Sequence, residues 1–162
     1  MAAITQALTT KTSRSNAPRT AAWRFRARHW PGRVAVGAFI LNSGLTKRTA
    51  DEGTAAQLHG FASGAYPFLG NLDARTFTRA LSWGEITLGT ALLLPLVPTG
   101  VVGAGLAAFS AGLLGLYLRT PGMRQPGSLR PTEQGTALAK DAWMFGMGLG
   151  FVVDDLLSES DR

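Results

Sequence analysis

The longest apolar stretch of this chain runs from Ile86 to Leu118, where 33 successive residues carry no charged side chain. A Pro95-x-x-Pro98-Thr99-Gly100 break lies near its middle. About 20 predominantly apolar residues are enough to cross the ~30 Å hydrocarbon layer of a bilayer. Proline and glycine end a helix where the chain has to reverse. The pattern therefore predicts two membrane-spanning helices joined by a tight turn.

Two weaker apolar runs flank this hairpin and bring the number of predicted spans to four. The first span is short, so we expect Arg33 and Lys47 to extend toward the two membrane surfaces. A soluble globule is the alternative, but a charge-free run of this length would need a larger core than this chain can build. The predicted spans cover about Pro31–Thr46, Phe77–Leu94, Val101–Leu118 and Thr136–Leu156.

The segment between the first two spans, Gly53 to Leu72, holds no formal charge and is rich in Gly, Ala, Ser and Pro. This composition predicts an interfacial or partly re-entrant loop, which must be covered by protein or water at membrane depth. Its aromatic part includes the turn-prone pair Tyr66-Pro67 and the ring of Phe68.

The charge distribution divides the chain into a basic tail (1–30), a membrane domain (31–157) and a short acidic tail (158–162). Seven basic residues lie at or before Arg33, and the first acidic residue is Asp51. A cytoplasmic tail that rests on anionic lipid and orients the first span explains this pattern; a transit peptide is the alternative. We favour the cytoplasmic tail, so we expect both termini in the cytoplasm, the lipid bilayer as partner and no nucleic-acid binding.

Composition excludes several kinds of chemistry. The chain contains no cysteine, which excludes disulfides, thiol catalysis and cysteine-held clusters. Its two histidines, His29 and His59, are too few for a His-rich metal centre, although His59 could supply one ligand. No phosphate-binding loop or dinucleotide fingerprint occurs. We therefore assign no catalytic residue and no metal ligand, and intrinsic catalytic activity is not expected.

Small residues recur every four positions in the last two predicted spans. In lipid, such faces let helices approach closely. The pattern leaves open whether they close one bundle or join two copies as a homo-oligomer, and we favour the bundle. The small residues are Ala104, Ala108 and Gly112 on one face, Gly103, Ala107, Ala111 and Gly115 beside it, and Gly146 and Gly150 in the last span.

Glu85 is the most informative single residue, because it lies about eight residues into the second span. An acid at that depth is costly unless it is paired, protonated or facing water. The first and third loops lie on the same side of a four-span protein, so several charges should gather in one half, while Arg33 faces Asp154 and Asp155 in the other. The gathered residues are Lys47, Arg79, Glu85, Arg119, Lys140 and Asp141.

These charges allow two interpretations: an ion-pair network that fixes helix register, or a polar pocket with Tyr66–Leu69 as its lid. In either case we expect Glu85 to interact with Lys140 or a nearby base. An excess of basic groups would suit an anion or a quinone carbonyl through charge-assisted hydrogen bonds. The candidate ligand-binding residues are Glu85, Lys140, Asp141, Lys47, Arg119, Trp83 and Tyr66.

Several short motifs make the chain from Arg33 to Leu157 resemble the DoxX-like family of small bacterial membrane proteins. In the first span they are Gly37-Ala38-Phe39 and Ser43-Gly44-Leu45-Thr46-Lys47. The others are Tyr66-Pro67-Phe68-Leu69, Glu85-Ile86-Thr87-Leu88-Gly89 and Lys140-Asp141.

The resemblance implies an all-α fold, an integral membrane bundle of four helices. Some family members are associated with thiosulfate:quinone oxidoreduction or with stress-response complexes. It thus implies an accessory or scaffolding subunit that recruits a membrane oxidoreductase. The alternative is a membrane protein that binds a quinone or a small anion around Glu85 and Lys140. A transporter is a weaker alternative, because four short helices would need to oligomerise.

Overall fold

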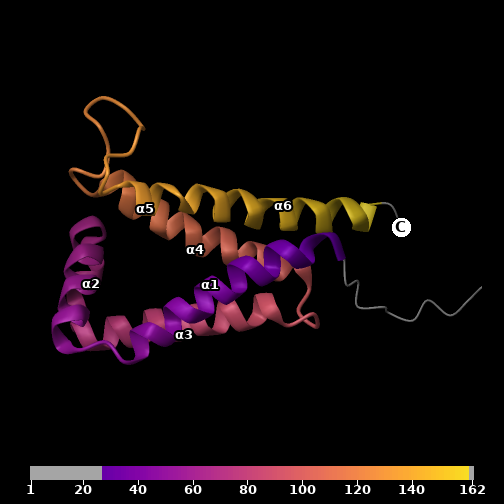
Figure 1. Cartoon of the computed structure of the whole chain (residues 1–162), viewed down its shortest axis with the longest axis horizontal. Coiled ribbons are helices and arrows are strands. Elements are labelled where there is room, and N and C mark those ends of the chain that lie inside the picture. Colours follow the sequence, from indigo (N-terminus) through magenta and orange to yellow (C-terminus); the bar gives the residue numbers. More distant parts are fainter. Residues whose placement is uncertain (1–26, 161–162) are drawn as a thin grey trace, which may run out of the picture.

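The computed structural model describes residues 27–160, and all of its named elements are helical (Figure 1). This confirms the all-α prediction. The predictions for the basic tail concern mainly residues 1–26, which lie outside the described residues. In chain order the elements are η1 Ala27–His29, α1 Trp30–Arg48, α2 Glu52–Ala65, η2 Pro67–Asn71, α3 Ala74–Leu93, α4 Thr99–Arg119, α5 Thr136–Ala139 and α6 Asp141–Ser160.

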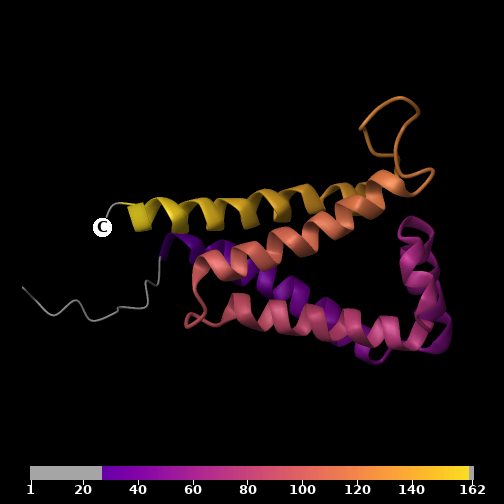
Figure 2. The same cartoon turned by 180° about the vertical axis from the view of Figure 1, so that it is seen from behind.

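The long helices form two antiparallel pairs, α1 with α3 and α4 with α6 (Figures 1 and 2). The pairs meet where α1 and α4 begin, and they separate toward the other end. Helices α3 and α4 are joined by the turn at 94–98, as the Pro/Gly break predicts, but they diverge from it instead of packing along their lengths. The arrangement is a wedge of two pairs, which differs from the closed bundle that we expected.

Both pairs are held by the same glycine contact. A Cβ atom on Gly89 of α3 would lie 2.8 Å from the carbonyl oxygen of Gly37 in α1. In the second pair, a Cβ atom on Gly148 of α6 would lie 2.8 Å from the carbonyl oxygen of Gly103 in α4. Real Cβ atoms essentially never come within 3.0 Å of such neighbours. Glycine is therefore required at both crossings, where the backbones touch.

The core follows from these crossings. The two pairs use equivalent positions around the crossing glycines. Val36 precedes Gly37 and Ile40 follows it by about one turn, just as Val102 precedes Gly103 and Leu106 follows it in α4. The two pairs thus bury equivalent faces against each other. The resulting cluster contains Val36, Ile40, Leu92, Val102, Leu106 and Phe151.

The small-residue faces are only partly as predicted. Gly103 and Ala107 do face the neighbouring helix α6. Gly146 and Gly150 do not, since a Cβ atom on either would meet nothing within 4 Å. The glycine of α6 that packs against α4 is Gly148, so the bundle-closing face lies on the other side of this helix.

Helix α2 replaces the loop that we expected between Gly53 and Leu72. It begins at Glu52 because the Asp51 carboxylate accepts a hydrogen bond from the backbone N–H of Thr54 at 2.7 Å. Hydrogen bonding from Thr54 also lowers the pKa of the Asp51 carboxyl. Ala55 and Ala62 are buried on one side of α2. The small side chains that suggested irregular backbone instead let a helix lie across the open end of the wedge (Figures 1 and 2).

The last predicted span is interrupted near its start. Helix α5 ends at Ala139 and α6 begins at Asp141, so Lys140 lies between two helices and is exposed. At the other end, α6 continues to Ser160, beyond the predicted boundary at 157.

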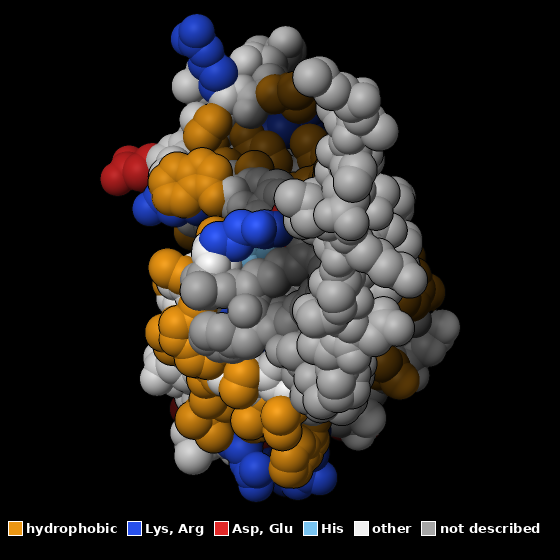
Figure 3. All heavy atoms as spheres, turned by 90° about the vertical axis from the view of Figure 1, so that its right-hand side faces the viewer, with side chains coloured by type: hydrophobic (Ala, Val, Ile, Leu, Met, Phe, Trp, Pro, Cys, Tyr) orange, Lys and Arg blue, Asp and Glu red, His pale blue; other side chains and the backbone are white. Residues whose placement is uncertain are grey.

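Among the described helices, α4 is long and apolar enough to cross a membrane. Many large hydrophobic side chains elsewhere in the described residues, and on α4 itself, are exposed. Figure 3 views the molecule from the end where α1 begins and α6 ends, and hydrophobic side chains cover much of the coloured surface. The exposed residues include Phe39, Leu45, Leu96, Val101, Trp143, Val153, Leu156 and Leu157.

Candidate functional site

The space between the diverging pairs is a cavity of about 550 Å³, which we call the central cavity. All four long helices, α2, η2 and α5 contribute to its wall. Aromatic and aliphatic side chains make up most of this wall, so a ligand would meet an apolar surface with few polar groups. The apolar lining includes Phe39, Leu58, Phe61, Leu81, Leu113 and Met144.

The main polar feature of the central cavity is an ion pair between Lys47 of α1 and Glu85 of α3. The Lys47 ammonium donates to both carboxylate oxygens of Glu85, at 3.0 and 2.8 Å. It also donates to the Ser43 hydroxyl at 2.6 Å. The Glu85 side chain is 5% exposed and that of Lys47 is 18% exposed. The acid expected to be costly at this depth is therefore paired.

Packing of α1 on α3 decides which base meets Glu85. A Cβ atom on Gly44 would lie 2.9 Å from the Cβ of Glu85, so the two helices are close at this level. The Ser82 hydroxyl donates to the Gly44 carbonyl at 2.7 Å. Lys47 lies one turn further along α1 and reaches the carboxylate. We expected Glu85 to pair with Lys140 or a nearby base, and the partner is the nearby base Lys47.

Tyr66 lies between α2 and η2 and closes one side of the central cavity. Its hydroxyl donates to the Gly112 carbonyl of α4 at 2.8 Å. The Arg119 guanidinium lies 4.8 Å from the centre of the Tyr66 ring. Leu69 of η2 also lines the cavity, and its carbonyl lies 2.9 Å from Nε2 of His59. His59 therefore holds η2 in place.

The structure separates the seven candidate ligand-binding residues into two groups. Glu85, Lys47, Tyr66 and Asp141 line the central cavity. The other three do not: Arg119 lies over the Tyr66 ring, Lys140 is exposed between α5 and α6, and Trp83 points outward, 55% exposed, beneath the Arg48 guanidinium. Trp83 and Glu85 are two positions apart on one helix, so they cannot face the same way.

Ser43 is a polar cavity residue that our sequence analysis did not single out as a site. It lies one turn before Lys47 on α1 and lines the cavity. Its hydroxyl oxygen accepts from Lys47, and its own proton has no acceptor among the described residues. The i, i+4 spacing of Ser43 and Lys47 on one helix is the sequence feature from which this contact could have been predicted.

Arg33 closes the narrow end of the wedge, and our expectation that it extends to the membrane surface was wrong. The residue is 5% exposed. Its guanidinium donates to backbone carbonyls of α3 and of the turn that follows, because these groups lack partners within the helix. The acceptors are the carbonyl oxygens of Leu92 (2.9 Å), Val97 (3.1 Å), Ala91 (3.0 Å) and Leu94 (2.7 Å), with Thr99 Oγ1 at 3.4 Å.

The expected interaction of Arg33 with Asp154 does not form. Arg28 forms an ion pair with Asp154, and Nε2 of His29 lies 3.4 Å from the other carboxylate oxygen. This contact joins the start of α1 to the end of α6.

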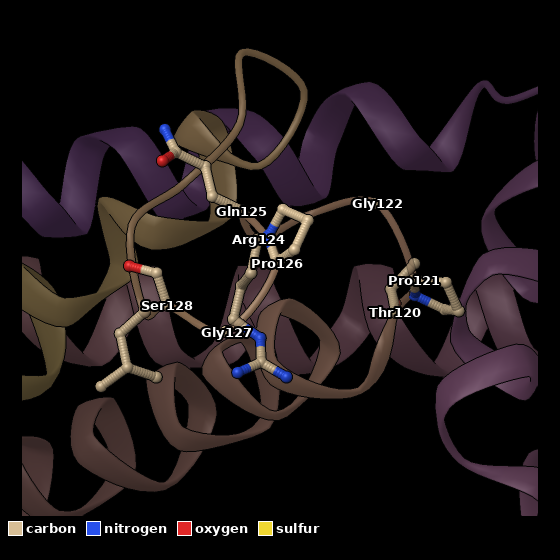
Figure 4. Close-up of a pocket in the computed structure, with 9 residues that line it drawn as sticks. Thr120, Pro121, Gly122, Arg124, Gln125, Pro126, Gly127 and Ser128 are labelled. Atoms are coloured by element: carbon tan, nitrogen blue, oxygen red, sulfur yellow. The ribbon is translucent and has the colours of Figure 1, made fainter.

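A second hollow, of about 440 Å³, lies within the loop that follows α4 (Figure 4). The loop reverses at Gly122 and Gly127, whose φ angles are +83° and +67°. Arg124 extends toward the end of α4, where it donates to the Leu118 carbonyl at 2.9 Å. This arginine thus supports the loop, and the hollow is formed by one surface loop alone.

The fold and the site define an all-helical protein whose two helix pairs enclose an apolar cavity with one buried ion pair. Comparison with protein-family models, with curated proteins and with solved structures finds no match to this chain. Membership of the DoxX-like family therefore stays a prediction that rests on the short motifs.

Proposed function

We propose that this chain is a multi-pass membrane protein that binds a largely apolar small molecule with a carbonyl group, such as an isoprenoid quinone, in the central cavity. The observation that carries the proposal is the cavity itself: about 550 Å³ of mostly apolar space with the Lys47–Glu85 pair in its wall. Ligand sites are typically concave, mainly apolar and supplied with a few placed polar groups.

Helix length and surface support the membrane part of the proposal. The four long helices have 19 to 21 residues, and a helix of this length spans about 30 Å. Their outward side chains include Leu45, Val101 and Val153, all well exposed. The charged groups Arg33 and Glu85, by contrast, are enclosed by protein. An apolar exterior with covered charges is what a bilayer requires.

Ser43 is the residue that we assign to the ligand carbonyl. Its hydroxyl accepts from the Lys47 ammonium, and its proton is available to donate into the cavity. A hydroxyl that accepts from a cation becomes a stronger donor. Lys47 and Glu85 act as positioning residues, because the ion pair fixes the ammonium against Ser43.

A filled-cavity variant tests this function. Gly112 lines the cavity, and a Cβ atom there would meet nothing within 4 Å. Gly112→Phe should weaken binding of a short-tailed quinone by more than about tenfold, measured by calorimetry on the purified chain in detergent. The matched control is Gly146→Phe, because a Cβ atom there also meets nothing but the position lies outside the cavity. Equal binding by both variants, or no quinone binding by the native chain, would overturn the proposal.

The accessory-subunit role stays a prediction from the resemblance. Co-purification of the native chain with a membrane oxidoreductase would support it.

A further inference from the structure

A smaller polar pocket of about 180 Å³ lies where α1 ends and where α2 and α3 begin. We call it the corner pocket. The wall of the central cavity is mostly apolar, whereas the wall of the corner pocket carries four basic and two acidic side chains. The charged lining residues are Lys47, Arg48, Arg75, Arg79, Asp51 and Glu52.

Most of these charges have partners. Arg75 forms an ion pair with Glu52, and the Arg48 guanidinium lies 4.7 Å from the centre of the Trp83 ring. The Asp51 carboxylate caps α2, and Lys47 pairs with Glu85. Arg79 differs, because it makes no hydrogen bond, ion pair or ring contact with any residue in the described part of the chain.

Thr78 gives a second, independent observation. It lines the corner pocket and is 3% exposed, and its hydroxyl oxygen is buried without a hydrogen-bond partner among residues 27–160. Buried polar groups in proteins are nearly always paired, so an unpaired one calls for an explanation. Thr78 and the unpaired Arg79 both line the corner pocket. One bound group with several acceptor oxygens would satisfy both.

We propose that the corner pocket binds a phosphate group. A phosphate oxygen pair matches the planar donors of an arginine, and Arg79 is free to supply them. Arg48 and Arg75 add positive charge, and the Thr78 hydroxyl supplies a neutral donor. Free inorganic phosphate and the phosphodiester of an anionic lipid share this chemistry. The lipid source rests on the proposed membrane insertion, which would place this helix corner at the lipid–water boundary.

Native mass spectrometry of the full chain in an uncharged detergent tests the proposal, with phosphatidylglycerol and phosphatidylcholine as matched lipids. We expect phosphatidylglycerol to bind the native chain more tightly. Arg79→Gln should weaken that binding about tenfold, the effect of losing a charge-assisted hydrogen bond. Arg130→Gln removes the same charge from the loop after α4 and should leave binding unchanged. Equal losses in the two variants would overturn the proposal, because the attraction would then come from net charge alone.

Thr78→Val provides a second variant, since it removes the hydroxyl at nearly constant shape. It should weaken phosphatidylglycerol binding without lowering the melting temperature; unchanged binding would contradict the role of Thr78. Competition by inorganic phosphate separates the two sources. Displacement of the lipid at equal concentration indicates a free-phosphate site, and displacement only at large excess indicates a headgroup site. The quinone-binding test with Gly112→Phe concerns the central cavity, and Gly112 does not line the corner pocket. Either proposal can therefore fail while the other holds.

Discussion

Lys47 and Glu85 form an ion pair across the α1–α3 interface, and the ammonium contacts both carboxylate oxygens. Removing one partner of a buried pair strands the other charge and costs about 3–5 kcal/mol. We therefore expect Lys47→Met and Glu85→Gln each to lower the melting temperature in detergent. The double variant should recover part of the loss. Additive losses in this double-mutant cycle would show that the two residues are not coupled.

Stability should also depend strongly on Arg33, because its guanidinium donates to several carbonyl acceptors at the end of α3. We expect Arg33→Met to cost about 3 kcal/mol or more, since charge-assisted hydrogen bonds contribute about 1.5–3 kcal/mol each. Arg33→Lys keeps the charge but loses the planar donors, and it should recover only part of the stability. Arg28→Gln is the control and should cost about 1 kcal/mol or less, because that ion pair is exposed. Thermal unfolding measures all three, and similar losses would contradict the prediction.

The glycine crossings should tolerate no side chain. A Cβ atom on Gly89 would lie 2.6 Å from the backbone nitrogen of Leu41, and one on Gly148 would lie 2.6 Å from that of Ala107. Gly89→Ala and Gly148→Ala should each destabilise the fold by about 1–3 kcal/mol through overpacking. Gly84→Ala, where a Cβ atom meets nothing within 4 Å, should instead stabilise α3 by up to about 1 kcal/mol. Urea unfolding in mixed micelles distinguishes these outcomes.

The start of α2 should depend on pH through Asp51. Hydrogen bonds from Thr54 lower the pKa of this carboxyl in the folded chain. Its contribution to stability is therefore present above its ordinary pKa of 3.8 and is lost as the pH falls through the lower folded value. Hydrogen exchange of α2 amides should accelerate at that pH. Asp51→Asn keeps a capping side chain that does not titrate, so hydrogen exchange of α2 amides in this variant should not accelerate at that pH. The same acceleration in the variant would show that another group is responsible.

Membrane insertion predicts that alkaline carbonate leaves the chain in the membrane pellet. Release into the supernatant would contradict the proposed membrane insertion. Reporter fusions at the two ends test the predicted cytoplasmic location of both termini, which follows from the basic residues before the first span. The transit-peptide alternative predicts a mature chain shortened by about 30 residues, visible by intact mass.

Local sequence determined where the long helices lie. Apolar runs and the Pro95–Pro98 break place α1, α3, α4 and most of α6 within a few residues of the predicted spans. These signals depend on neighbours along the chain, so they can be read without knowing the fold. They fail for α2, because Ala and Gly at 53–65 are compatible with loop and helix alike, and the buried contacts of Ala55 and Ala62 decide between them.

Tertiary structure decided which charges meet. The sequence indicated that Glu85 pairs with Lys140 or a nearby base, and the Gly37–Gly89 crossing brings α1 against α3, so that Lys47 is that base. The same packing buried Arg33, whose carbonyl partners lie about 60 positions away along the chain. The central cavity exists because α3 and α4 diverge after their turn. Neither the divergence nor the pairing is encoded in any short segment, since both result from close backbone contacts between helices that are distant in sequence.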